Sequence, residues 1–140
     1  MAAYRDADEM REIFGALAER TAGSGAAKAL HEAGMVVSFV YHNPDLVLVM
    51  DGRTPGEGEP PMAMRFDVGE PAPDVTFECS ADVGHQFWSG RLDVPQALGR
   101  GIVKARGSIA KALKLLPMMP PLYAAYNALL EERARAAGGS

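Results

Sequence analysis

Apolar residues recur at helical spacing near the N-terminus, at Met10, Ile13, Phe14 and Leu17. Charged residues fill most positions between them, so the pattern predicts an amphipathic helix over about residues 4–20. A second, shorter helix is predicted near residues 26–32, and Gly34 is placed to end it. The chain is therefore expected to open with two helices.

Patterns typical of strands follow in the middle of the chain. Residues 35–41 and 46–50 are rich in valine and flank a turn signal at 43–45, which predicts a hairpin. The run 46–50 is apolar on both faces and is expected to lie centrally in a sheet that is covered on both sides. Residues 62–68 and 75–80 alternate apolar and polar side chains, which is typical of strands with one wet face. Short links between these four strands predict an antiparallel meander.

Helical spacing returns after residue 80 and is interrupted once. Further helices are predicted over residues 82–89, 95–100, 109–116 and 122–136. The segment 101–107 is short and bounded by glycines, so it predicts a fifth strand. Ser108 is a suitable N-cap for the helix that follows it.

Length and composition narrow the class of protein. The chain has 140 residues, 48% of them hydrophobic and 23% charged, which predicts a single globular domain over residues 1–140. No apolar run approaches the roughly 18 residues of a membrane span, and the acidic N-terminus lacks the order of a secretory signal. Cys79 is the only cysteine, which excludes an intramolecular disulfide and a cysteine-rich zinc site. A cytoplasmic location is therefore expected.

The net charge of -4 conceals an uneven distribution. Residues 1–93 carry 7 basic and 16 acidic side chains, whereas residues 94–140 carry 7 basic and 2 acidic ones. Five cations fall within fifteen residues: Arg100, Lys104, Arg106, Lys111 and Lys114. Such a group either faces phosphates or forms an ordinary solvated surface. Nucleic acid is not expected as a partner, because no aromatic residue interleaves the cations and the isoelectric point is about 5.3.

The residues that carry chemistry do not form a catalytic arrangement. The three histidines lie in different predicted elements, and none forms a helical pair suited to a metal. Asp82 and His85 can share a helix face, as a base with its carboxylate or as a surface pair. Cys79 alternates with Val75 and Phe77 and is expected to be a buried structural residue. We therefore expect a protein that is not an enzyme and that holds no metal or cofactor.

A methionine-, leucine- and tyrosine-rich segment follows the predicted helix 109–116. Its apolar side chains would have to be buried by the predicted helices 109–116 and 122–136, which a proline-rich hinge separates. Methionine is flexible and polarizable and lines sites that accept ligands of varied shape. The segment is consequently either ordinary core or part of a ligand pocket.

Two motifs follow each other in the second half of the chain. The turn 89–93 (Ser-Gly-Arg-Leu-Asp) precedes the predicted short helix, and the segment 101–108 (Gly-Ile-Val-Lys-Ala-Arg-Gly-Ser) leads into a leucine-rich helix. In this order the two motifs resemble the type-2 sterol carrier protein (SCP-2) domain. Arg91 replaces the usual lysine. The resemblance covers about residues 25–120 and is motif-specific over 89–116.

The resemblance implies an α+β fold, with a five-stranded, mostly antiparallel sheet and helices packed on one face. It also implies an apolar tunnel for a fatty acid, acyl-CoA, phospholipid or sterol. Carried over to this sequence, the tunnel lining would be Phe87, Trp88, Leu92, Leu98, Ile102 or Val103, Leu113 and Leu116. Helical spacing adds four residues that would close the tunnel: Met118, Met119, Leu122 and Tyr126.

The expected function is the non-enzymatic binding or transfer of an apolar lipid. The five cations would hold a ligand headgroup or dock the protein peripherally on an anionic membrane. The chain ends without a Ser-Lys-Leu-type peroxisomal address, so a bacterial or cytosolic setting is expected. Two alternatives stay open. In one, the tunnel is filled and the extended C-terminal helix forms a homodimer or binds a protein partner; in the other, the protein is an accessory in lipid or steroid catabolism.

Overall fold

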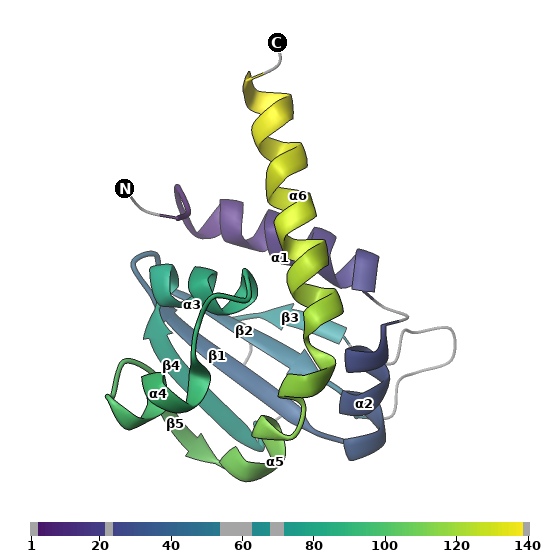
Figure 1. Ribbon diagram of the computed structural model, residues 1–140, viewed down its shortest axis with the longest axis vertical. Helices are drawn as coiled ribbons and strands as arrows, with labels where there is room; N and C mark the ends of the chain where they lie inside the picture. The colour runs from purple at the N-terminus through teal and green to yellow at the C-terminus, as the bar shows by residue number, and fades with distance from the viewer. Residues whose placement is uncertain (1–2, 22–23, 54–62, 68–71, 139–140) are drawn as a thin grey trace.

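A five-stranded sheet carries the helices on one of its faces (Figure 1). The computed structural model describes residues 3–21, 24–53, 63–67 and 72–138. The elements in chain order are α1 (Ala7–Thr21), α2 (Gly25–Ala33), β1 (Val36–His42), β2 (Leu46–Asp51), β3 (Ala63–Phe66), β4 (Val75–Ser80), α3 (Ala81–Trp88), α4 (Val94–Gly99), β5 (Lys104–Gly107), α5 (Ile109–Leu113), the 3₁₀ helix η1 (Leu116–Met118) and α6 (Pro120–Gly138).

The strand order is β3-β2-β1-β4-β5. All neighbours pair antiparallel except β1 and β4, which are parallel, so the sheet is mostly antiparallel as predicted. The predicted meander is correct for β1, β2 and β3 but wrong for β4, which pairs with β1 instead of β3. A strand that is buried on both faces is stabilised by a neighbour on each edge, and β1 obtains its second neighbour from β4.

The strand register divides the sheet into two faces. The helix-covered face carries the alternating apolar residues of the three inner strands: Val37, Phe39, Tyr41, Leu46, Leu48, Met50, Val75, Phe77 and Cys79. The opposite face carries the residues between them, and Val36, Ser38 and Val49 are also buried there. Of residues 46–50, all but Val47 are buried; Val49 is buried on the face away from the helices, where Val47 is half-buried. The middle strand is β1 and not β2, as its neighbours β2 and β4 show.

Short polar residues and glycines set the helix ends. The Ser24 hydroxyl accepts the Ala27 N–H at the start of α2, and Gly34 ends that helix with φ of 62°, in the left-handed region. Ser80 caps α3 in the same way by accepting the Val83 N–H at 3.1 Å. Gly34 and Ser80 thereby set the directions in which the chain enters β1 and leaves β4.

The predicted helix 109–116 is shorter in the structure. It ends at Leu113, and a 3₁₀ turn precedes α6. Pro117 disfavours a helical conformation at the residue before it, and it cannot donate a helical hydrogen bond. Ser108 sits at the N-cap position of α5, but its side chain makes no capping hydrogen bond there. The break brings η1 and the start of α6 over the sheet.

Helices α1 and α6 cross above the sheet, and the C-terminal half of α6 extends beyond it (Figure 1). Ion pairs join the two helices, with Arg20 contacting Glu132 and Arg133 contacting Glu12. Phe14 of α1 stacks between Tyr41 of the sheet and Tyr126 of α6. The two terminal helices are therefore packed against the sheet through an aromatic core.

Candidate ligand-binding site

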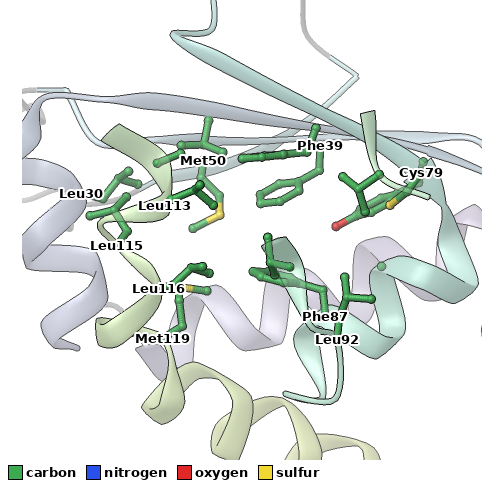
Figure 2. Close-up of a pocket in the computed structure, with 17 residues that line it drawn as sticks. Leu30, Phe39, Met50, Cys79, Phe87, Leu92, Leu113, Leu115, Leu116 and Met119 are labelled. Atoms are coloured by element: carbon green, nitrogen blue, oxygen red, sulfur yellow. The ribbon is translucent and has the colours of Figure 1, made fainter. Parts of the chain in front are cut away.

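An apolar cavity lies between the helix-covered face of the sheet and the helices (Figure 2). The cavity has a volume of about 80 Å³. Its walls are formed by Leu30, Val37, Phe39, Tyr41, Met50, Phe77, Cys79, Gly84, Phe87, Leu92, Val94, Val103, Ala112, Leu113, Leu115, Leu116 and Met119.

The sheet and the helices supply opposite walls of the cavity. Strands β1, β2 and β4 contribute the residues that point to the helix side, among them Phe39 and Met50. Figure 2 shows Leu116 and Met119 across the cavity from these two side chains. Leu30 and Leu115 lie at one end of the view and Cys79 lies at the other. The cavity is thus elongated along the sheet surface.

Among the described residues that form the lining, none has a charged side chain and only Tyr41 and Cys79 are polar. Burial raises the pKa of the Cys79 thiol to about 11, so the thiol is protonated at neutral pH. Burial also raises the pKa of Tyr41 well above its usual value, so its hydroxyl is neutral. The environment suits an uncharged, mainly apolar group.

Helix α3 positions the Tyr41 ring at the cavity wall. A Cβ at Gly84 would lie 2.5 Å from Cε1 of Tyr41, so only glycine permits this approach of helix and ring. One helical turn later, the Trp88 indole N–H donates to the Tyr41 hydroxyl oxygen at 2.9 Å. Both contacts hold the ring in one position.

Six of the predicted lining residues lie in the cavity wall: Phe87, Leu92, Val103, Leu113, Leu116 and Met119. Contact with a ligand remains a prediction for each of them. They lie in α3, α5 and η1 and in the short links beside α4, β5 and η1.

The other six predicted lining residues lie elsewhere. Trp88, Leu122 and Tyr126 are fully buried but pack in the aromatic and apolar core beside the cavity. Leu98 is half-buried outside the wall, while Ile102 and Met118 are 46% and 41% exposed. Neighbouring residues of a helix point about 100° apart, so Phe87 faces the cavity while Trp88 faces Phe14.

Sequence reasoning did not assign the sheet residues of the wall to the site. The alternation that places Phe77 and Cys79 on one face was visible in the sequence, and the same alternation in β1 selects Phe39 and Tyr41. Leu30 of α2 gave no such indication, because its position depends on how α2 packs at the end of the sheet.

The five cations predicted for headgroup contact, Arg100, Lys104, Arg106, Lys111 and Lys114, are all exposed, and none lines the cavity. None forms an ion pair within the described part of the chain, whereas Arg11, Arg20 and Arg133 each do. The register of β5 places Lys104 and Arg106 opposite Glu78 and Thr76, on the sheet face away from the helices. All five side chains therefore face solvent.

Asp82 and His85 of α3 are each hydrogen-bonded to a different partner instead of to each other. The Asp82 carboxylate accepts the Ala3 N–H at 2.9 Å, and Nδ1 of His85 is hydrogen-bonded to the Tyr126 hydroxyl at 2.8 Å. Among the described residues, no three histidine, cysteine or acidic side chains come together as a metal site. In that part of the chain, no helix has the length and apolar character needed to cross a bilayer.

Comparison with known proteins gives matches in structure only. No family model and no curated protein sequence matches the chain. The sterol carrier protein domain 2 of Helicoverpa armigera is 22% identical, with a TM-score of 0.56 over 79% of this chain and 84% of that one. Sterol carrier protein 2 of Yarrowia lipolytica is 13% identical, with a TM-score of 0.54 over 79% of this chain and 90% of that one.

A third similar structure is an enzyme. The stereoselective inverting sec-alkylsulfatase Pisa1 of a Pseudomonas species is 20% identical over 66% of this chain, with a TM-score of 0.54. The chain spans only 14% of the length of that sulfatase. The similarity therefore concerns one part of a larger protein, and identities this low show the fold alone.

Proposed function

From the premise that this chain has the SCP-2 fold, we propose that it binds an apolar lipid in the cavity and carries it without catalysing a reaction. The observation that carries the proposal is the uncharged wall between sheet and helices. Burial of a lipid chain is favourable by about 0.8 kcal/mol per methylene, so a cavity of this kind can bind without a charged anchor.

The helix-side wall can adapt to ligands of different lengths. Leu115 and Leu116 are only half-buried, and they lie in and beside the short 3₁₀ turn that separates α5 from α6. Met119, at the end of this turn, has a flexible side chain that can change rotamer at low cost. A chain longer than the present cavity would be accommodated by displacement of these side chains.

The direct test is native mass spectrometry of freshly purified protein, followed by organic extraction. A co-purifying lipid, or the uptake of an offered lipid in a one-to-one complex, is expected. A protein that stays unliganded and takes up no fatty acid, sterol or apolar dye would contradict the proposal. That result would favour the alternative in which the protein's own side chains fill the cavity and the protein binds a protein partner.

A matched pair of variants localises the binding. Ala112 lines the cavity from α5, whereas Ala110 is exposed on the same helix. Ala112→Phe should occupy the cavity and abolish uptake, and Ala110→Phe should leave uptake unchanged. Equal uptake by both variants would place any bound lipid outside this cavity.

We further propose that the five exposed cations Arg100, Lys104, Arg106, Lys111 and Lys114 act together as a basic surface that docks the protein on anionic membranes. The exposed side chain of Ile102, which lies between Arg100 and Lys104 in the sequence, would contribute to this surface. Cations near an anionic bilayer each contribute roughly 1 kcal/mol, and an apolar side chain can enter the interface. Docking here would bring the carrier to its lipid source.

A further inference from the structure

The hydroxyl group of Tyr41 has one defined hydrogen bond and one unused donor. An indole N–H can only donate, so Trp88 occupies a lone pair of the Tyr41 oxygen. The Tyr41 proton must then be donated elsewhere. No described residue accepts it, although Tyr41 is only 1% exposed. A buried donor without an acceptor is costly, and this one belongs to a side chain of the cavity wall.

We propose that Tyr41 is the polar anchor of the cavity and donates its hydroxyl proton to a neutral oxygen of the bound lipid. Suitable groups are a ketone or ester carbonyl, an ether or a hydroxyl. This inference rests on the proposed function and assigns the ligand a chemical class: an apolar chain or ring system with one uncharged oxygen at one end.

The position of Tyr41 fixes the orientation of the ligand. Tyr41 is the register partner of Cys79 across β1 and β4, so its backbone lies at the Cys79 end of the cavity. Leu30 and Leu115 lie at the opposite end (Figure 2). The oxygen of the ligand therefore lies near Cys79, and the apolar part extends along Phe39 and Met50 toward Leu30.

The anchor is rigid because its surroundings hold the ring from two sides. Gly84 contacts the ring edge, and Trp88 holds the hydroxyl oxygen. Phe14 and Phe39 stack on the ring at centroid distances of 6.2 and 6.0 Å. The donor is thus positioned before a ligand arrives, and little conformational freedom is lost on binding.

An ionised group does not fit this end of the cavity. Within the described residues, the wall holds no cation that could compensate a buried carboxylate. The thiol of Cys79, the other polar group nearby, is protonated. A neutral acceptor gains the hydrogen bond from Tyr41 without the desolvation cost of a charge.

The test compares methyl octyl ketone with undecane, which has the same number of heavy atoms but no oxygen. Both are titrated against an apolar naphthylamine dye bound to wild type, Tyr41→Phe and the control Tyr123→Phe, whose side chain is half-buried outside the wall. In Tyr41→Phe, the affinity for the ketone should fall about tenfold and that for undecane should stay the same. In Tyr123→Phe, neither affinity should change. Equal changes for both ligands in Tyr41→Phe would overturn the inference.

A second measurement needs no variant, because Tyr41→Phe also leaves the Trp88 N–H without its acceptor and can disturb folding. The infrared carbonyl band of ¹³C-labelled ketone bound to wild type should shift to lower frequency than in hexane. A bound ketone with an unshifted band would overturn the role of Tyr41 while the proposed function stands. If neither ketone nor undecane displaces the dye, the proposed function itself fails.

Discussion

Tyr4 and Tyr126 lie 122 positions apart in the chain and share a buried hydrogen bond between their hydroxyl groups. Tyr126 is also hydrogen-bonded to Nδ1 of His85. Each hydroxyl has one proton, so the two hydrogen bonds run in the same direction. Tyr4 donates to Tyr126 and Tyr126 donates to His85 when Nδ1 carries no proton, and both directions reverse when Nδ1 is protonated. The N-terminal segment, α6 and α3 are thereby joined through one polar chain inside an apolar core.

Removal of the middle hydroxyl should cost more than removal of the terminal one. Tyr126→Phe leaves both the Tyr4 hydroxyl and the His85 nitrogen without their partner, whereas Tyr4→Phe leaves the bond from Tyr126 to His85 in place. We expect a loss of about 1 kcal/mol in the free energy of unfolding for Tyr4→Phe and about 2–3 kcal/mol for Tyr126→Phe. Urea unfolding followed by tryptophan fluorescence measures both free energies. Equal losses in the two variants would contradict the hydrogen-bonded chain of Tyr4, Tyr126 and His85.

The pH dependence of stability should contain a term from His85 with a defined sign. Burial, followed by the nearby Arg91 charge, lowers the pKa of His85 in the folded protein. The unfolded state therefore binds the proton more readily, so this residue makes the protein less stable as pH falls through about 6.5 and below. His85→Gln should reduce that loss, measured as the difference in unfolding free energy between pH 7.5 and pH 5.

His42 provides the opposite control. Its hydrogen bond to Glu78 raises its pKa in the folded protein, so His42 stabilises the fold at low pH and loses this effect as pH rises through the raised value. His42→Gln should therefore steepen the loss of stability toward pH 5. An identical pH profile for the two variants would contradict the assignment.

Two helical glycines should respond oppositely to alanine. A Cβ at Gly84 meets the buried Tyr41 ring at 2.5 Å, whereas a Cβ at Gly15 in α1 meets nothing within 4 Å. Gly84→Ala should destabilise the protein by about 1–3 kcal/mol, because the ring and its hydrogen bond to Trp88 must shift. Gly15→Ala should stabilise it by about 0.5–1 kcal/mol through helix propensity. Thermal unfolding distinguishes the two, and a neutral Gly84→Ala would contradict the close packing.

Local sequence patterns predicted the helices and strands better than they predicted which strands pair. Alternation fixed which residues of β4 face the helices, and Gly34 marked the end of α2, because both depend on neighbouring positions only. The pairing of β4 with β1 joins residues about forty positions apart and leaves no period in the sequence. The same limit applies to the site. Phe87 and Trp88 are adjacent aromatic residues, and only the packing of α3 decides which one faces the cavity.

Charge reversal on the basic surface should weaken binding to anionic vesicles. Lys111→Glu with Lys114→Glu removes two exposed cations, so affinity for vesicles containing phosphatidylserine should fall by roughly thirtyfold or more at low salt. Lys28→Glu with Arg135→Glu changes the net charge equally at exposed positions outside this surface. Co-sedimentation compares the two double variants, and an equal loss in both would indicate a general charge effect without a docking surface.

Cys79 should report occupancy of the cavity through its reactivity. Its thiol lines the wall, and burial raises its pKa to about 11, so the thiolate is on the order of a hundredfold scarcer at pH 7.4 than for an ordinary exposed cysteine. Alkylation by iodoacetamide, followed by mass spectrometry, should therefore be slow in the unliganded protein. A ligand that fills the Cys79 end should slow it further, whereas Ala110→Phe should leave the rate unchanged. Fast alkylation of the unliganded protein would show that this end of the cavity is open to solvent. Alkylation that a saturating lipid does not slow would show that the lipid lies elsewhere.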